Sequence, residues 1–330
     1  MKEFIIGKND EGQRLDRFAA KTAPLLPDSL SQKYIRLKRI KVGGKGAKRD
    51  YRLARGDVVQ MYINDEFFSP ESRRARSKAD DEIAFSAYPE PKLDIVYEDD
   101  NILLVNKEAG LLCHSESAFV YASLIAKVQA YLYRKGQWRP SEENSFAPAL
   151  CNRIDRNTSG IVLAAKNAES LRIINEKIKL REIDKYYLAV VHGAPDPSSG
   201  TLEGWIFKDS VKNQVYVTKQ WQTGSKYAAT EYKTIASYNG LTLLECRLIT
   251  GRTHQIRAQF AQSGSPLLGD GKYGVSQLNK HYGESRQALC SYRLVFRFDT
   301  DAGILGYLNN NSFQLRDIPF VSKYFPRVNI

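Results

Sequence analysis

One short segment of the sequence holds an acidic side chain between two basic ones. In residues 152–160 (NRIDRNTSG), Asp155 follows Arg153 by two positions and precedes Arg156 by one. Opposite charges within about 4–6 Å favour the ionised form of a carboxylate, and an ionised carboxylate can attack an electrophilic carbon or accept a proton. Taken alone, the same spacing is more often a structural Asp–Arg turn, so other segments must decide between the two interpretations.

Metal and nucleotide chemistry find little support in the sequence. The chain has four histidines, His114, His192, His254 and His281. Their positions show no H-x-x-x-H spacing and no Cys/His ligand spacing. A phosphate-binding loop of the type G-x-x-x-x-G-K-[ST] is also absent. We therefore expect neither a metal ion nor an organic cofactor.

The cysteines and the hydropathy pattern bear on the cellular compartment. The four cysteines are widely separated, form no C-x-x-C pair and follow no secretory signal. No stretch approaches the roughly 18 apolar residues that a membrane-spanning helix needs. We therefore expect reduced thiols in a soluble, cytoplasmic monomer without a membrane partner.

The charge of the chain is concentrated near its N-terminus. The formal net charge is +12 and the sequence pI is about 9.4, so the surface should attract polyanions or acidic membranes. Residues 1–60 hold 15 Lys or Arg against 7 Asp or Glu. Charge alone does not establish a nucleic-acid role, but it identifies the N-terminal end as the basic module.

This basic end predicts two short helices, a hairpin and a strand. Residues 14–23 place apolar side chains at helical spacing, and Ser31 is expected to cap the second helix. A turn rich in Gly and Lys (42–57) then leads into residues 58–63, which have the composition of a strand. This order resembles the small S4-like RNA-binding module, with a generic basic helical cap as the alternative. The residues expected to contact RNA are Arg14, Arg36, Lys38, Arg39, Lys41 and Lys45.

The remaining sequence divides into a linker and a larger domain. Residues 66–91 mix charges, Ser and Pro with little apolar periodicity, which is typical of a linker. We therefore expect an N-terminal module over 1–65 and a second domain over 92–330. Strand-like runs dominate the second domain and predict an α+β fold around a mixed, mostly antiparallel sheet. The helices are expected over 121–134, 168–180 and 253–262, and the strands in DIVYEDDNILLVNK, IVLAAK, KYYLAVV, TEYKTIA, LTLLECRLIT and LCSYRLVFRF.

Five segments in order give the larger domain a family resemblance. The segment NRIDRNTSG with IVLAAK resembles the catalytic signature of the RluA-type pseudouridine synthases. Four further segments agree with the same family: DIVYEDDNILLVNKEAGLLCHS, KYYLAVVHG, LITGRTHQIRAQFAQSG and PLLGDGKYG. The resemblance covers about residues 92–300, and it implies a catalytic domain of the pseudouridine synthase type beside the small α/β S4-like module.

The resemblance implies roles for individual residues. Asp155 matches the catalytic aspartate, and Tyr187 matches the tyrosine that stacks on the target base and helps remove its C5 proton. Arg257 matches the basic partner of the aspartate, and Arg153 matches the arginine that replaces the extruded base in the RNA stack. Further RNA contacts are expected from Arg156, Arg252 and His254. Two positions depart from the family, since Asn152 and Gln259 stand where many members have His, and they could bear on which RNA is bound.

The implied activity is the isomerisation of uridine to pseudouridine in a structured RNA. Asp155 would promote cleavage of the glycosidic bond, either by attacking the sugar carbon or by removing a sugar proton. The S4-like module favours 23S ribosomal RNA as the partner, with tRNA as the alternative. The rivals from other classes are an RNA-binding or assembly factor without catalysis and a metal-dependent nuclease.

Overall fold

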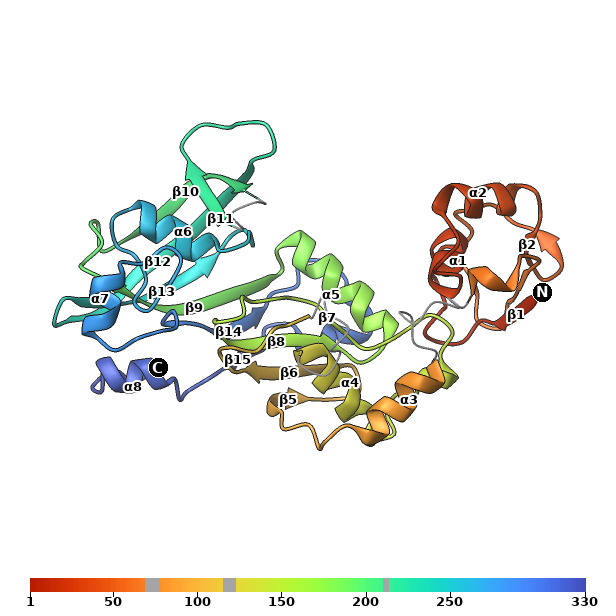
Figure 1. The fold of residues 1–330 in the computed structure, drawn as a ribbon, viewed down its shortest axis with the longest axis horizontal. Helices are drawn as coiled ribbons and strands as arrows, with labels where there is room; N and C mark the ends of the chain where they lie inside the picture. The colour runs from red at the N-terminus through yellow and green to blue at the C-terminus, as the bar shows by residue number, and fades with distance from the viewer. Residues whose placement is uncertain (69–77, 115–122, 210–213) are drawn as a thin grey trace. The chain divides into compact units, whose positions relative to one another are not determined.

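The computed structural model describes residues 1–68, 78–114, 123–209 and 214–330. The chain folds as two compact units (Figure 1). The first unit comprises Met1–Lys92, Ser115–Ala149 and Ala165–Arg172, and the second comprises Leu93–His114, Leu150–Ala164 and Ile173–Ile330.

The N-terminal part of the first unit packs two helices against a small sheet. The helices are α1 (Leu15–Thr22) and α2 (Asp28–Arg36). The sheet has the order β1-β4-β2-β3 with antiparallel pairing. Phe18 of α1 is fully buried in the core that the helices and the sheet share. The strands are β1 (Lys2–Ile5), β2 (Ile40–Val42), β3 (Lys45–Gly46) and β4 (Val58–Met61).

The start of the second helix differs from the prediction. Helix α2 begins at Asp28, directly after Pro27, so Ser31 lies inside the helix and is buried rather than capping it. The acidic side chain of Asp28 stabilises the positive N-terminal end of the helix one turn earlier than a serine cap would.

The segment that we expected to be a linker contains regular structure. A short 3-10 helix (Asp65–Phe67) overlaps its first residues, and helix α3 (Lys78–Ala87) lies within it. The Phe85 ring contacts the rings of Tyr133 and Trp138, with centroids 5.9 and 5.6 Å apart. These aromatic contacts with α4 (Leu124–Arg134) and the residues after it stabilise a helix whose own sequence has weak periodicity.

The second unit is built on a large sheet. Among the described residues the strand order is β11-β10-β12-β13-β9-β14-β8-β6-β5, with β15 beside β14 and β7 beside β8. Strand β14 runs parallel to β8 and antiparallel to β9, so the expected mixed, mostly antiparallel sheet is confirmed. The strands are β5 (Asp94–Glu98), β6 (Ile102–Lys107), β7 (Ala149–Leu150), β8 (Ser159–Ala165), β9 (Ile183–His192), β10 (Ser199–Asp209), β11 (Gln214–Thr218), β12 (Lys226–Tyr238), β13 (Leu241–Leu248), β14 (Leu289–Phe296) and β15 (Ser312–Gln314).

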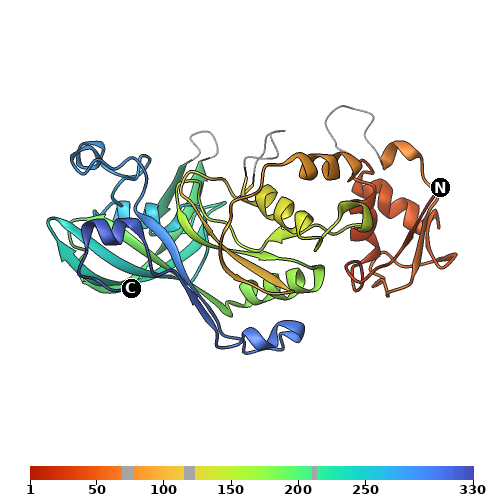
Figure 2. The ribbon, with the colours of Figure 1, turned by 90° about the horizontal axis from the view of Figure 1, so that it is seen from below.

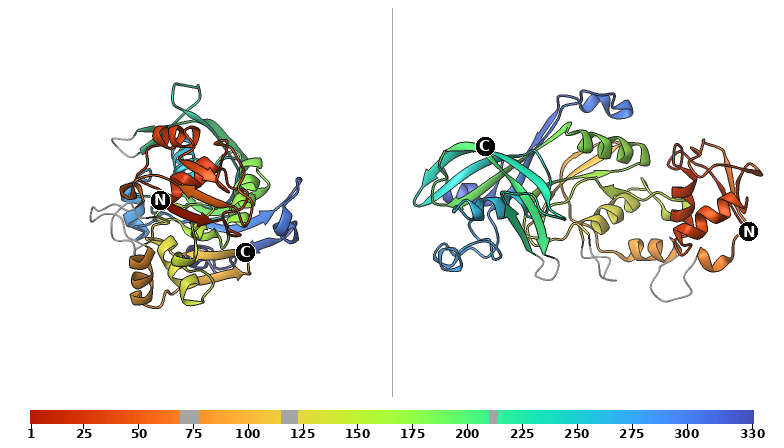
Figure 3. Two further views of the ribbon diagram at one scale, coloured as in Figure 1. Left: turned by 90° about the vertical axis from the view of Figure 1, so that its right-hand side faces the viewer. Right: turned by 90° about the horizontal axis from the view of Figure 1, so that it is seen from above.

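Helices cover parts of this strongly twisted sheet (Figures 2 and 3). Helix α6 (Gln255–Gln262) packs on β10, β11 and β12, where Ala258 joins a small apolar core with Ile206 and Val215. The other helices are α5 (Ala168–Leu180), α7 (Ser276–His281) and α8 (Pro319–Tyr324), with a 3-10 helix over Gly303–Leu308. No helix in the described part of the chain is long and apolar enough to cross a membrane.

Candidate active site

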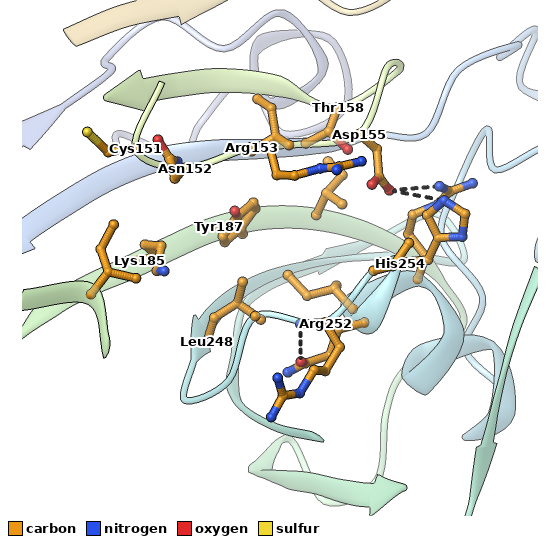
Figure 4. A pocket seen from close by; sticks show the side chains of 18 residues that line it. Cys151, Asn152, Arg153, Asp155, Thr158, Lys185, Tyr187, Leu248, Arg252 and His254 are labelled. Atoms are coloured by element: carbon orange, nitrogen blue, oxygen red, sulfur yellow. Dashed lines mark hydrogen bonds and ion pairs between the residues drawn. The ribbon is translucent and has the colours of Figure 1, made fainter. Parts of the chain in front are cut away.

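A cavity of about 270 Å³ lies in the second unit beside Asp155 (Figure 4). Its walls include residues between 151 and 158 that precede β8, residues of strand β9, and the loop that leads into α6. Three catalytic candidates that are far apart in the sequence, Asp155, Tyr187 and Arg257, all line this cavity. Such a volume lies just below the roughly 300–1,000 Å³ of small-ligand sites, which suits a single nucleotide.

Arg257 holds Asp155 through one of its three guanidinium nitrogens. Its Nη1 donates to Oδ2 of Asp155 at 2.8 Å. Its Nε and Nη2 donate to the two carboxylate oxygens of Asp270, at 2.7 and 3.0 Å. The Asp270 side chain is fully buried and also accepts hydrogen bonds from the backbone N–H groups of Lys272 and Tyr273. Burial alone would raise the pKa of Asp270, but the hydrogen bonds and charge of Arg257 outweigh it and lower that pKa.

The contacts of Asp155 leave one of its oxygens free. Both Arg257 and His254 approach Oδ2, His254 with its Nε2 at 3.8 Å. Oδ1 of Asp155 has no hydrogen-bond partner among the described residues. A quarter of the Asp155 side chain is exposed. The carboxylate is therefore anchored at one oxygen and available to a bound molecule at the other.

Buried groups fix the backbone around Asp155. The ammonium of Lys107, only 1% exposed, donates to three backbone carbonyls: those of Glu108 and Leu111 at 2.8 Å and that of Arg156 at 3.1 Å. Gly110 donates its N–H to the same Arg156 carbonyl at 2.8 Å. The turn after β6 therefore clamps the loop that presents Asp155.

His254 connects Asp155 to a tyrosine. Its Nδ1 lies 2.8 Å from the hydroxyl of Tyr273, which accepts a hydrogen bond from the Val215 N–H at 2.9 Å. When the Tyr273 hydroxyl donates to Nδ1, the remaining ring proton is on Nε2 and faces Asp155. Burial lowers the pKa of His254, which favours this neutral form. The backbone of His254 has a φ of 52°, a strained value for a residue other than glycine.

Tyr187 lies in the middle of the sheet on β9, next to β13 and β14. Its side chain is on the cavity wall, and the residue is only 6% exposed (Figure 4). Burial raises the pKa of its phenol far above the ordinary value, and the negative charge of Asp155 adds to this rise. Tyr187 is therefore a neutral phenol, which can accept a proton only if its own hydroxyl proton leaves at the same time.

The other residues expected near the site are exposed arginines. Arg153 and Arg252 line the cavity, and the Arg153 guanidinium points toward Asp155 (Figure 4). Arg252 donates its Nε to the Tyr227 carbonyl at 3.0 Å, and Arg156 donates its Nε to the Gly110 carbonyl at 3.1 Å. Each of these side chains keeps further N–H groups at the surface.

The expected RNA contacts of the N-terminal module differ in their surroundings. Arg36 and Lys38 line an open surface hollow beside α2, and Lys45 is exposed on β3. The Arg39 guanidinium lies over the Tyr34 ring and the Lys41 ammonium lies over the Tyr62 ring, at 5.3 and 5.1 Å from the centroids. Arg14 is instead paired with both oxygens of Asp16, at 3.0 and 2.6 Å, so part of its charge is already neutralised.

The two positions that depart from the family pattern have different environments. Gln259 is 3% exposed, accepts a hydrogen bond from Thr230 at 2.7 Å and donates to the Leu202 carbonyl at 2.8 Å. Its amide is therefore held by contacts inside the protein, and its bearing on which RNA is bound stays a prediction. Asn152 lines the cavity instead.

Sequence reasoning assigned no role to Lys107, Asp270 or Tyr273. All three lie inside segments that resemble the family, but their contacts with the site depend on tertiary structure. Residues 269–274 (GDGKYG) also match the letters G-x-G-x-x-G of dinucleotide-binding loops. This match has a structural explanation, because a Cβ at Gly269 would lie 2.0 Å from the Arg286 carbonyl oxygen and one at Gly274 would lie 2.3 Å from that of Asp270. Among the described residues, no three His, Cys, Asp or Glu side chains are grouped so as to bind a metal.

Comparisons with known proteins identify the class of this fold and site. The family model for RNA pseudouridylate synthases matches residues 101–262. In the human RNA pseudouridylate synthase domain containing 4, the same fold recurs with a TM-score of 0.53 and 19% identity, over 73% of this chain and 93% of that one.

Curated relatives agree over most of the chain. An uncharacterised RNA pseudouridine synthase from Mycoplasma capricolum is 31% identical over 94% of this chain and 96% of its own length. Ribosomal large subunit pseudouridine synthase C from Vibrio vulnificus is 32% identical over 82% of this chain and 79% of its own length. The protein of the same name from Escherichia coli is 29% identical over 88% of this chain and 85% of its own length. The chain therefore belongs to the RluA-type family of RNA pseudouridine synthases, which are isomerases.

Proposed function

We propose that this isomerase converts uridine to pseudouridine in large-subunit ribosomal RNA, with Asp155 as the group that starts the reaction. The observation that carries the proposal is the arrangement of Asp155, Arg257 and Asp270. The buried Arg257, which Asp270 fixes in place, holds Asp155 by a single oxygen, and no described residue bonds to the other oxygen. This arrangement suits a carboxylate that must act on a bound molecule.

A target uridine inside folded RNA must leave its stack to reach this cavity. Flipping a nucleotide costs a few kcal/mol of stacking. The exposed Arg153 could occupy the space that the base leaves, and the ring of Tyr187 offers a stacking surface worth roughly 1–3 kcal/mol for the flipped uracil. Both residues line the cavity that also presents Asp155, so one bound nucleotide could contact all three.

The reaction rearranges bonds without adding or removing atoms. The bond between N1 of uracil and C1′ of ribose breaks, the uracil turns, and C5 forms a new bond to C1′. C5 then loses its proton and N1 gains one. Asp155 starts the first step either as a nucleophile, whose new bond to C1′ breaks when C5 attacks, or as a base, which later returns the sugar proton. Tyr187 accepts the C5 proton while its own hydroxyl proton moves to Asp155, which releases it to solvent, and N1 takes a proton from solvent.

The choice of ribosomal RNA rests on the relatives and on the basic N-terminal module. Relatives from Vibrio vulnificus and Escherichia coli are named ribosomal large subunit pseudouridine synthases. Transfer RNA is the alternative substrate, and an RNA-binding factor without catalysis is the alternative function. The presence of Asp155, Tyr187 and Arg257 in one cavity favours an enzyme over an RNA-binding factor without catalysis.

The test is to map pseudouridines in 23S ribosomal RNA and tRNA from a strain that lacks the gene. One or more sites in 23S ribosomal RNA should be missing, should return with the wild-type gene, and should stay missing with Asp155→Asn. This substitution keeps the size of the side chain and removes its charge, so the variant protein should still bind RNA. Missing sites in tRNA alone would refute the choice of RNA, and sites restored by Asp155→Asn would refute the catalytic role.

A further inference from the structure

The cavity has a second group of polar side chains that the proposed chemistry does not use. Asn152 and Lys185 lie on the same side of the cavity, away from Asp155 and His254 (Figure 4). Lys185 is two residues before Tyr187 on β9, and side chains two apart on a strand point to the same face. Lys185 and Tyr187 therefore both face the cavity.

The side chain of Asn152 ends in a buried donor without an acceptor. Its Oδ1 accepts a hydrogen bond from the Leu163 N–H at 2.7 Å, which settles which end of the carboxamide is oxygen. Its Nδ2 is buried and has no hydrogen-bond partner among the described residues. A buried donor without an acceptor lowers the stability of the protein by about 1–3 kcal/mol. A ligand that accepts a hydrogen bond from this donor would remove that penalty, which would favour its binding.

Lys185 is a partly buried cation without an anion. In the part of the chain that the structure describes, its ammonium has no ion pair and no hydrogen bond. Burial lowers its pKa, and no carboxylate among the described residues opposes the shift. A partly buried cation that lacks a partner would be stabilised by a bound anion.

We infer that Lys185 and Asn152 form a phosphate subsite, which binds a backbone phosphate of the nucleotide that enters the cavity. Both groups are hydrogen-bond donors and one is charged, so they suit a phosphate better than a neutral carbonyl, which would leave the ammonium charge uncompensated. The inference rests on the proposed function, since it assigns this side of the cavity to the nucleotide whose sugar lies at Asp155. A phosphate held here would fix the position of that sugar relative to the carboxylate.

The experiment measures the binding of small probes to the full chain by equilibrium dialysis. The probes are uridine, uridine 5′-monophosphate, uridine 3′-monophosphate and inorganic phosphate. At least one of the monophosphates should bind roughly tenfold or more tightly than uridine, because charge-assisted hydrogen bonds add to the nucleoside contacts. The two nucleotides distinguish which backbone phosphate is bound.

Two substitutions and one control assign this preference to the subsite. Lys185→Gln removes the charge, and Asn152→Asp keeps the acceptor for the Leu163 N–H while replacing the free donor by an acceptor. Both should reduce monophosphate binding to about the level of uridine and leave uridine binding unchanged. Lys280→Gln makes the same charge change at an exposed position on α7, and it should alter neither monophosphate binding nor uridine binding.

Three results would overturn the inference: no monophosphate preference in the wild-type chain, a preference that survives Lys185→Gln, or a loss of uridine binding in Lys185→Gln that points to a base contact. Assaying the same proteins for pseudouridine formation in ribosomal RNA separates this inference from the proposed function. A Lys185-dependent preference in a chain that forms no pseudouridine would leave the subsite intact and refute the function. Pseudouridine formation by a chain that shows no preference for monophosphates would refute the subsite and support the proposed function.

Discussion

Arg257 divides its guanidinium between the buried carboxylate of Asp270 and the carboxylate of Asp155, for which we propose the reactive role. The two-point contact with buried Asp270 fixes the plane of the guanidinium, because two parallel N–H···O bonds allow little rotation. Nη1 of Arg257 then has a fixed direction in which to hold Asp155. A lysine could supply the charge at this position but could not bind both carboxylates with this geometry.

The buried phenol of Tyr187 allows its stacking and proton-transfer roles to be separated. Tyr187→Phe keeps the ring and should retain the RNA affinity of the wild type within about twofold, since stacking needs only the ring. The rate of isomerisation in single-turnover assays should fall by roughly 10²–10⁴, because the variant lacks the hydroxyl that we propose moves the C5 proton. Equal losses of affinity and rate would instead indicate that the hydroxyl contributes to binding.

The Lys107 clamp predicts a loss of activity at alkaline pH. Burial lowers the pKa of Lys107 to about 8, although nearby negative charges oppose the shift. Below this pKa the ammonium has three N–H donors for its three carbonyl acceptors, and above it the neutral amine has two. The single-turnover rate should therefore be highest below about pH 8 and fall as the pH rises through that value.

Lys107→Met is the control for this assignment. The variant should be slower than the wild type at neutral pH, because the loop that presents Asp155 loses its clamp, and its rate should lack the fall near pH 8. A variant that keeps the same alkaline fall would show that another group causes it.

At the scale of elements, the packing of β8 against β14 requires glycine at position 160. Gly160 has a φ of +115°, and a Cβ there would lie 2.3 Å from the backbone oxygen of Ser291 on β14. Gly160→Ala should therefore destabilise the protein by at least about 4 kcal/mol, or prevent folding, because neither backbone can move without breaking the sheet next to Asp155. Denaturant and thermal unfolding measure the effect.

Gly136 is a matched control for this substitution. It also has a positive φ, +67°, but no atom lies within 4 Å of the position where a Cβ would be. Gly136→Ala should cost only about 1–2 kcal/mol, which is the backbone penalty of a left-handed residue. If both variants were equally stable, the clash with Ser291 would not be the reason for glycine at 160.

The sequence allowed the type of most elements in the larger domain to be predicted, because their apolar periodicity is strong. Helix α5 has the predicted bounds, and the expected strands around Tyr187 and after Asp155 are present. The parallel pairing of β8 with β14 could not be predicted, since it joins residues about 130 positions apart. The same limit applies to the site, because tertiary structure alone brings Asp270 to Arg257 and Lys107 to the backbone carbonyl of Arg156. It also applies to α3, which depends on aromatic contacts with residues 133–138.

At the scale of the whole molecule, charge and chemistry are separated along the chain. Residues 1–60 have a large excess of basic side chains, whereas Asp155, Tyr187 and Arg257 all belong to the second unit. Electrostatic contacts of the N-terminal module should therefore contribute affinity that does not depend on nucleotide sequence, while the cavity selects what reacts.

This separation predicts how salt affects RNA binding. Each phosphate contact by Lys or Arg contributes about 0.7–0.9 to the slope of log affinity against log salt concentration. Arg36 and Lys38 are exposed at the hollow beside α2, so the double variant Arg36→Gln, Lys38→Gln should weaken binding to 23S ribosomal RNA. The slope should become shallower by about 1.4–1.8, measured by filter binding between about 50 and 200 mM salt.

The matched control removes one arginine and one lysine from other exposed positions. The double variant Lys280→Gln, Arg327→Gln has the same change of net charge but alters α7 and the C-terminal residues. It should bind with nearly the wild-type slope, because a slope counts phosphates that are contacted and not net charge. Equal changes of slope in both double variants would mean that the chain attracts RNA by its overall charge, and the N-terminal module would then lose the specific binding role proposed for it.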